Sequence, residues 1–552
     1  MMLSRHSSFS RVGSRISRFI APSSIITSVG LRAFFFSSSC SSSSFLSHSF
    51  RLAPPPATSS SSFSSPNKPY LVQTRTVLFY TTDHRGSRVN ASQLQTGRDA
   101  VTALQSSAKS KRKLDPNMIE CVVELLETSR KMSMIDLTIC LYSLRIYSIN
   151  DHFVKELLLA LAGKLSTGNV SFNAQAVGNA LYGLQNMSSE DKEVRDLLVV
   201  LRDQVVRCTE PLRAQAVGNA LYGLQNMSSE SKEVRDLLVV LRDQVGKCTE
   251  VLRAQHVGNA LYGLQNMSSE SKEVRDLLVV LRDQVVRCTE PLDAQAVGNA
   301  LYGLQNMSSE SKEVRDLLVV LRDQVGKCTE PLRAQAVGNA LYGVLRFDLD
   351  TSWSWFIKVL LDSISQCDGS NNFVDVGTIL QSLCLITSAK SYPLSQSIKE
   401  MGLLDEIVLQ KNRLAQVFNA HPEVVSRIGV AVNRNEKKYF LAACGAFRDI
   451  PGVTLSNNEY IEGFEADIVI RKESSSSLSV EESSSKKELS TIINVELEGP
   501  IYKHKLRKKR FCEARDRYLF DTVGVRVVRW ELMSMRGLTN EQIIKKFREL
   551  VL

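Results

Sequence analysis

The sequence lacks the features that mark several classes of protein. Its eleven cysteines form no CxxC pair and no cysteine–histidine cluster, and four of them occupy one position of a repeat. Neither a zinc site nor a disulfide framework is therefore indicated, and we expect free, buried thiols in a reducing compartment. No apolar run approaches the ~18–20 residues that a membrane-spanning helix needs, so no transmembrane segment is expected.

Acidic residues are absent from residues 1–82, which hold eight lysines and arginines. The formal net charge of +10 lies mostly in this leader, because the rest of the chain has 60 basic and 58 acidic residues. An acid-free leader rich in arginine and serine is typical of an organellar transit peptide. We expect residues 1–115 to form a transit peptide and a disordered serine-rich leader. The predicted compartment is the mitochondrial matrix, with a plastid as the alternative.

A 40-residue unit is repeated through the middle of the chain. The segment AQAVGNALYGLQNMSSE begins at Ala174, Ala214, Ala254 (where its third residue is His256) and Ala294, and it begins again at Ala334. Degenerate copies on both sides extend the repeat to about seven units between residues 116 and 395. A fixed period of this length indicates a solenoid, a propeller or an array.

Two helical patterns fill each unit. Val177, Ala180, Leu181 and Leu184 share one helical face within residues 174–187, and a second apolar stripe runs from Val194 to Val205. Between the patterns, Ser188 and Ser189 are predicted N-cap residues of the second helix. Asp203 and Arg207 are a predicted i,i+4 ion pair, as are Asp243 and Lys247 in the next unit. With no strand pattern in the unit, the prediction is an α-solenoid of helix hairpins.

A polar stripe lies opposite the apolar face of each first helix, with Gln175, Asn179, Tyr182 and Asn186 in the first copy. Amide side chains can read base edges and an aromatic ring can stack on an unpaired base. The candidate RNA-binding residues are Asn179, Tyr182, Asn219, Tyr222, Asn259, Tyr262, Asn299 and Tyr302. The alternative is that these side chains contact the neighbouring unit. The near-neutral charge of each unit also leaves a protein-binding scaffold open.

The repeat resembles the organellar helical-repeat families of 38–40 residues, the octotricopeptide type and its relatives. In those families an asparagine followed by an aromatic residue marks the first helix, as Asn179 and Tyr182 do here. The copy upstream has Ile139 at the asparagine position, which suggests a capping role for that unit.

The pattern changes in residues 396–552, where linker helices precede a small α/β domain. A disordered serine-rich loop is expected at 473–489. The predicted order is helix 435–448, strands 452–455, 464–470 and 491–497, helix 511–522 ended by Gly524, and strand 525–530.

This order resembles the PD-(D/E)XK nuclease-like fold, and more narrowly the RAP domain and its very-short-patch-repair-like bacterial relatives. The residues that carry the likeness are Asp467, Glu496-Leu497-Glu498-Gly499-Pro500, Arg515-Asp516-Arg517-Tyr518-Leu519, Gly524 and Arg526-Val527-Val528-Arg529. The resemblance implies a restriction-endonuclease-like fold and a role in organellar RNA metabolism.

Three carboxylates are the candidate catalytic residues of that fold: Asp467, Glu496 and Glu498. Carboxylates at the ends of adjacent strands can hold Mg²⁺, which would activate water for phosphodiester cleavage. Glu498 stands where the nuclease pattern has a lysine, and this departure weakens the case for catalysis. The alternative is that the carboxylates cap strands or pair with Arg515 or Arg517.

A dense basic run follows the third expected strand and would contribute phosphate affinity by releasing counterions. The candidate RNA-binding residues here are Lys503, His504, Lys505, Arg507, Lys508, Lys509, Arg510 and Arg515. Tyr502, Tyr518 and Trp530 are nearby aromatics that could stack on bases, although core packing is favoured for Trp530.

Three functions follow from these patterns. The first is an organellar protein that binds single-stranded RNA and acts in RNA processing, stability or translation, with no cofactor. The second is a metal-dependent endonuclease, in which Asp467 and Glu496 would hold Mg²⁺. The third is a scaffold that binds proteins through the solenoid. The sequence does not specify the RNA target.

Overall fold

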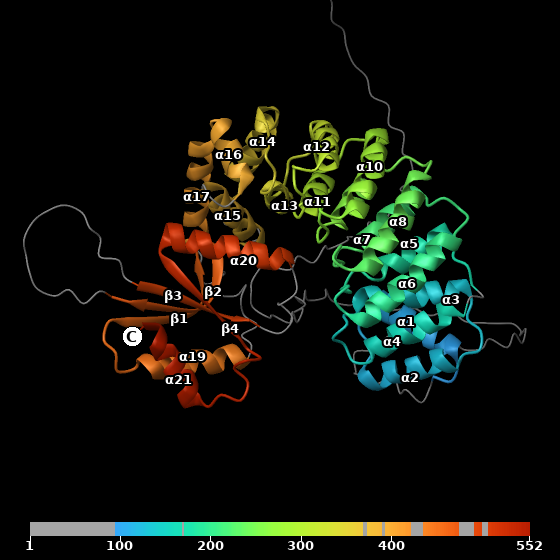
Figure 1. Cartoon of the computed structure of the whole chain (residues 1–552), viewed down its shortest axis with the longest axis horizontal. Helices are drawn as coiled ribbons and strands as arrows, with labels where there is room; N and C mark the ends of the chain where they lie inside the picture. Colours follow the sequence, from blue (N-terminus) through green and yellow to red (C-terminus); the bar gives the residue numbers. More distant parts are fainter. Residues whose placement is uncertain are drawn as a thin grey trace, which may run out of the picture. The chain divides into compact units, whose positions relative to one another are not determined.

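The computed structural model describes residues 94–167, 170–367, 373–388, 392–420, 434–473, 491–498 and 506–551 (Figure 1). These residues are mostly helical, with regularly repeating helix pairs followed by a small mixed sheet of four strands. The arrangement agrees with an expected solenoid followed by a small α/β domain.

The repeating helices form two layers, because each helix packs on the equivalent helix of the next unit. The first-helix layer contains α3 (Met134–Ser143), α5 (Ala174–Tyr182), α7 (Ala214–Tyr222), α9 (Ala254–Tyr262), α11 (Ala294–Gly303) and α13 (Ala334–Val344). The second-helix layer contains α2 (Pro116–Thr128), α4 (Val154–Ser166), α6 (Lys192–Arg207), α8 (Lys232–Gly246), α10 (Lys272–Arg287), α12 (Lys312–Val325) and α14 (Ser354–Ser365).

Further helices continue this array at both ends. They are α1 (Gly97–Ser110), which packs on α2 and α3, and α15 (Phe373–Thr387), α16 (Pro393–Glu400) and α17 (Leu404–Asn419). Short 3₁₀ turns span Leu144–Ile146 and Thr351–Trp353. Helix α1 lies inside the range 1–115 that was assigned to the leader, so helical packing begins ahead of the expected boundary.

The first helix of a unit is shorter than the apolar pattern indicates. Helix α5 begins after Asn173, whose side chain accepts a hydrogen bond of 2.8 Å from the N–H of Ala176. The helix ends at Tyr182, and a turn in which Leu184 N–H donates to the carbonyl of Leu181 completes the run. The apolar positions of the turn therefore stay on the buried face without belonging to the helix.

The two serines expected to cap the second helix have another role, so that prediction is wrong. Helix α6 begins after Asp191, which makes no side-chain cap hydrogen bond. The Ser189 hydroxyl instead accepts a hydrogen bond of 2.9 Å from the N–H of Ser228, in the next unit. The serine position is repeated because it joins neighbouring units.

Glycines allow the helices of the first-helix layer to approach one another closely. A Cβ atom on Gly258 would lie 2.9 Å from Cα of Ala296, and one on Gly263 would lie 1.9 Å from the carbonyl oxygen of Leu221. Real side chains do not tolerate such contacts, because the backbone of the neighbouring helix cannot move away without repacking. The two glycines of the repeated segment AQAVGNALYG are therefore requirements of packing.

Polar groups join the units as well. The Glu250 carboxylate accepts a hydrogen bond of 2.8 Å from the N–H of Ala214, where α7 begins, so one unit caps the helix of the unit before it. The Gln244 amide donates to the carbonyl of Cys208 at 3.2 Å.

The ion pairs expected within α6 and α8 are replaced by others. Asp203 pairs with Arg202 rather than with Arg207, at 2.7 Å between Nη2 and Oδ1. Arg242 pairs with Asp243 at 2.7 Å and reaches Asp276 of the next unit at 3.4 Å. Each aspartate therefore pairs with the arginine that precedes it in the sequence, and not with the basic residue one turn later.

The sheet contains β1 (Val453–Ile461), β2 (Phe464–Lys472), β3 (Thr491–Glu498) and β4 (Val525–Glu531), in that spatial order. The pairs β1–β2 and β2–β3 are antiparallel, and β3–β4 is parallel. Helices α19 (Arg434–Phe447) and α21 (Asn540–Val551) cover one face, and α20 (Leu506–Tyr518) lies on the other (Figure 1). Ile468, Ile470 and Phe547 belong to the core under α19 and α21.

The predicted order of one helix, three strands, one helix and one strand is confirmed. Strand β1 runs past the expected 452–455 because its polar residues pair with β2; the register is constant along the pair, although the backbone pairing skips Asn458, at φ 51°, and Asp467 opposite it. A π-helical turn, Leu519–Val523, separates α20 from Gly524, which takes the left-handed conformation expected of it. Helix α21 was not predicted, and most of the loop at 473–489 lies outside the described residues.

Candidate nucleic-acid interface

The repeated tyrosines stack on one another. Ring centroids of Tyr182 and Tyr222 are 5.6 Å apart with planes 21° from parallel, and the stacking continues in both directions from Tyr142 to Tyr302. Burial, followed by the neighbouring tyrosines, raises the pKa of Tyr182 to about 12. A base inserted between two rings would need about twice the ~3.4 Å spacing of stacked nucleotides. The ring faces of Tyr182, Tyr222, Tyr262 and Tyr302 are therefore used within the array.

The second asparagine of each polar stripe is also used within the array. The Asn226 amide donates a hydrogen bond of 2.6 Å to the carbonyl of Gln185, 41 residues earlier. Equivalent bonds of 2.6–2.7 Å are made by Asn186, Asn266 and Asn306. This position holds neighbouring units in register.

The first asparagine of the stripe differs from the tyrosine and from the second asparagine. We call Asn179, Asn219, Asn259 and Asn299 the asparagine row. All four are half-exposed, and their side chains make no hydrogen bond to any residue that the structure describes. Gln175, one turn earlier, is exposed, as are its equivalents Gln215, Gln255 and Gln295. Of the four positions in the polar stripe, the glutamine and the first asparagine thus remain accessible to a ligand.

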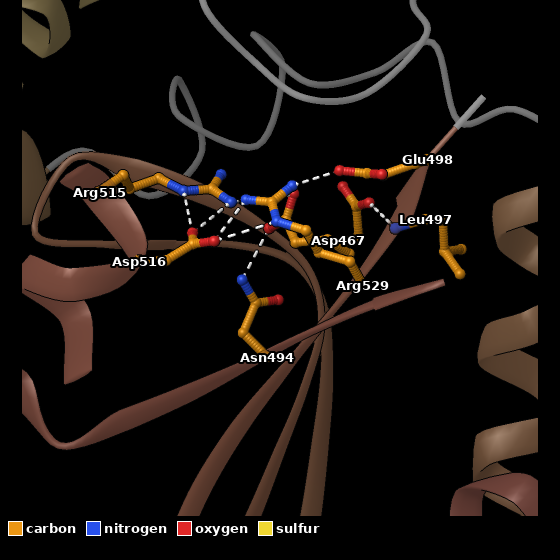
Figure 2. Close-up of polar contacts among 8 residues, drawn as sticks. Asp467, Asn494, Leu497, Glu498, Arg515, Asp516 and Arg529 are labelled. Carbon is orange, nitrogen blue, oxygen red and sulfur yellow. Dashed lines mark hydrogen bonds and ion pairs between the residues drawn. The ribbon is translucent and has the colours of Figure 1, made fainter. Parts of the chain in front are cut away.

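The three candidate catalytic carboxylates lie on β2 and β3, and each has a protein partner. Figure 2 shows Asp467 and Glu498 with theirs. Oδ2 of Asp467 accepts a hydrogen bond of 2.7 Å from the N–H of Leu497. Glu496 accepts one of 2.7 Å from the Asn494 amide, and Glu498 accepts one of 2.6 Å from Arg529. Asp467 is only 2% exposed and Glu496 only 1%.

Two arginines complete a partly buried network around these carboxylates. Arg515, on α20, is 2% exposed; its Nη2 lies 3.4 Å from Oε2 of Glu496 and 3.0 Å from Asp516. Asp516 is shared with Arg529 at 2.7 Å. Burial and the nearby Arg515 lower the pKa of Arg529, but the charge and hydrogen bond of Asp516 outweigh them and raise it overall. We name Asp467, Glu496, Glu498, Arg515, Asp516 and Arg529 the charged network.

The arrangement does not fit a magnesium site. Mg²⁺ prefers an octahedral shell of oxygen ligands, and here Glu496 and Glu498 face guanidinium groups while Asp467 accepts a backbone N–H. Within the described ranges no three histidine, cysteine, aspartate or glutamate side chains are grouped so that they could hold a metal ion. Arg515, expected on an RNA surface, is an interior partner of the carboxylates, which is the alternative that the sequence left open.

The basic run is only partly described. Lys503, His504 and Lys505 lie outside the described residues. Arg507, Lys508, Lys509 and Arg510 belong to the first turns of α20, whose backbone is described there while the side chains are not. Phosphate binding by this run stays a prediction.

The exposed aromatic residue of the C-terminal domain is one that the sequence reasoning missed. Tyr518 and Trp530 are buried, and Tyr502 lies outside the described residues. Phe520 follows the buried Leu519 on the π-helical turn and is 63% exposed. The sequence indicated this exposure, because an aromatic residue one position past the buried face of a helix points toward solvent.

Comparisons with known proteins add no family to this description: no protein-family model matches the chain, and the search of curated proteins finds no relative. None of the described helices is long and apolar enough to cross a membrane. The ten described cysteines are all free thiols.

Proposed function

We propose that this protein binds single-stranded RNA in an organelle, the mitochondrial matrix or alternatively a plastid, and acts in RNA processing, stability or translation. The acid-free leader supports import. The resemblance of Asp467, Glu496–Pro500 and the α20 motif to RAP domains supports a role with RNA, without a cofactor.

The asparagine row is the observation that carries the proposal. An amide side chain presents a donor and an acceptor side by side and can bind an adenine edge through both. Neighbouring units are 5.6 Å apart at the adjacent tyrosines, more than the ~3.4 Å rise of a stacked strand. A strand that follows the row with one base per unit would therefore be unstacked, as in RNA-binding repeat proteins.

Selection from a random RNA pool by the full mature chain tests this proposal. Because the row presents four identical asparagines, a run of one repeated nucleotide should be enriched. The double variant Asn219→Ala/Asn259→Ala should lose that preference, whereas Asn226→Ala/Asn266→Ala, a change at the structural position, should keep it. No enrichment together with no salt-sensitive binding would refute RNA recognition by the array.

A protein-binding scaffold is the second candidate, and a row of exposed aliphatic side chains favours it. The row has one member per unit on the second-helix layer, each 36–48% exposed: Leu159, Val199, Val239, Val279, Val319 and Val359. The half-exposed carboxylates of Asp203, Asp243, Asp283 and Asp323 lie one turn away, each paired with the arginine that precedes it. This face fits the apolar side of an amphipathic protein segment.

The two candidates differ in what each set of substitutions removes. For a scaffold, Val239→Glu/Val279→Glu should release a protein partner recovered with the wild-type chain from organelles, and the wild-type chain should not bind RNA. For the RNA-binding protein, the same variant should bind RNA as the wild-type chain does.

Cleavage is the remaining alternative, and no observation favours it. Single-stranded RNA incubated with the full chain and Mg²⁺ or Mn²⁺ should stay intact. Degradation that disappears in Asp467→Asn would contradict the binding proposal and support a nuclease.

A further inference from the structure

Four arginines of the C-terminal motif fall into two classes. Arg515 and Arg529 are members of the charged network. Arg517 and Arg526 are exposed, and they make no ion pair or side-chain hydrogen bond with any residue that the structure describes. Residues two apart on a helix point to different sides, so Arg517 faces away from the network that holds Arg515. The two exposed arginines are thus not needed for the fold.

Phe520 lies between these two arginines in the chain. It stands three residues after Arg517, a spacing that places both side chains on one face of a helical turn. The turn is π-helical, a rare geometry that is frequent at functional sites. Gly524 then ends the turn in the left-handed conformation, and Arg526 follows as the second residue of β4. Arg526 lies opposite Ile493, which belongs to the core under α19 and α21, so its side chain is on the other face of the sheet from α20.

Buried neighbours hold the turn that carries Phe520 in place, but they do not cover the Phe520 side chain. Tyr518 and Leu519, the two preceding residues, are each 1% exposed and anchor the turn in the core. Asp521 and Thr522 are exposed neighbours, so Phe520 has one arginine, Arg517, and one carboxylate close to it in the chain. A side chain as large and apolar as phenylalanine gains nothing from this position in the isolated chain.

We infer that Phe520 is a stacking platform for an unpaired base of single-stranded RNA, with Arg517 binding a phosphate next to that base. The inference rests on the proposed RNA-binding function and gives it a second contact point, outside the array. A single strand supplies both an aromatic face and regularly spaced anions, which together match an exposed ring beside a cation. An apolar protein surface would cover the ring and leave the guanidinium group of Arg517 without a partner.

Binding of a short homopolymeric RNA to the full mature chain tests the inference. Phe520→Ala should weaken binding about ten-fold, the loss of one base–aromatic stack, and leave the salt dependence unchanged. Arg517→Ala should reduce the slope of log K against log salt by about 0.7, one phosphate contact on a single strand, whereas Arg526→Ala, on the other face of the sheet, should leave the slope unchanged. Leu441→Ala, which removes a 59% exposed apolar side chain on α19, and Lys437→Ala are the matched controls and should bind as the wild-type chain does.

Two conservative variants separate stacking from simple apolar contact. Phe520→Tyr should restore wild-type affinity, whereas Phe520→Leu should be as weak as Phe520→Ala. A 2-aminopurine in the RNA should lose fluorescence on binding the wild-type chain, and that quenching should disappear in Phe520→Ala. Since the side chain is exposed, the variants should unfold at the wild-type temperature.

The outcomes distinguish the inference from the proposed function. If the wild-type chain binds no RNA, the proposed function fails and the inference fails with it. If the wild-type chain binds but Phe520→Ala or Phe520→Leu binds equally well, the platform is overturned while RNA binding stands.

Discussion

The helical array and the C-terminal sheet use polar residues in opposite ways. In the array each polar position is repeated every 40 residues, so its role can be established by comparing four copies: Tyr222 stacks, Asn226 bonds to a carbonyl, and Asn219 does neither. In the sheet each polar residue occurs once, and Asp467, Glu496 and Arg515 are drawn into one buried network.

This difference shows how far a residue pattern indicates function. Repetition of a polar residue does not separate ligand binding from structural bonding, because both are repeated. A cluster of carboxylates does not separate catalysis from structure either, because a buried guanidinium can hold them. What separates the roles is the partner of each side chain, and substitutions that remove one partner at a time should therefore distinguish them.

The largest effect is expected in the charged network. Arg515→Ala leaves the buried Glu496 and the half-buried Asp516 without this guanidinium, and loss of one partner of a buried ion pair costs roughly 3–5 kcal/mol. The unfolding free energy of the full chain, followed by chemical denaturation, should fall accordingly. Arg517→Ala is the control and should change it by less than about 0.5 kcal/mol. Equal effects would mean that Arg515 is not an interior residue.

Helix packing in the array gives the next largest effect. Gly263→Ala places a Cβ 1.9 Å from the carbonyl oxygen of Leu221 and should destabilise the array by about 1–3 kcal/mol. Gly246→Ala, at the last residue of α8, meets its nearest neighbour at 3.8 Å and should stabilise by up to about 1 kcal/mol. Thermal unfolding of the two variants should therefore shift in opposite directions; shifts of the same sign would contradict the close approach.

The two asparagine positions should separate stability from binding. Asn226→Ala removes a hydrogen bond to Gln185 and should cost about 1 kcal/mol of stability without altering base preference. Asn219→Ala should alter RNA affinity and leave stability within about 0.5 kcal/mol. Both variants need denaturation and RNA-binding measurements, and the account fails if the two positions behave alike.

The smallest effect is expected on the second-helix layer. Val239→Glu/Val279→Glu changes exposed side chains on α8 and α10, and not on the first helices that carry the asparagine row, so RNA affinity at moderate salt should stay within about two-fold, or roughly 0.4 kcal/mol. A large loss of RNA affinity would move the interface to this face.

Much of the fold could be predicted because it rests on periodicity. The 40-residue period, the two helices per unit and the strands 464–470, 491–497 and 525–530 all follow from apolar spacing that local sequence carries. The serine positions could not be interpreted in this way, because the partner of Ser189 is Ser228, 39 residues away. Helix α21 was missed although its apolar positions include Ile543 and Phe547, both fully buried.

The site was less predictable, for a physical reason. The role of a polar residue depends on what lies across a packed surface, and the sequence does not state those neighbours. Arg515 and Arg517 are both basic residues of one helix, yet one is interior and the other exposed. Phe520 was overlooked because the aromatics considered, Tyr518 and Trp530, were chosen by type rather than by their place relative to the buried face.

Crosslinking of the protein to RNA inside isolated organelles tests the central claim most directly. After ultraviolet irradiation, sequencing of the bound fragments should give a small set of organellar transcripts that share a near-homopolymeric run. The crosslinked peptides should contain the asparagine row or the Phe520 turn. Recovery of no RNA above background, from organelles in which the protein is abundant, would contradict the account.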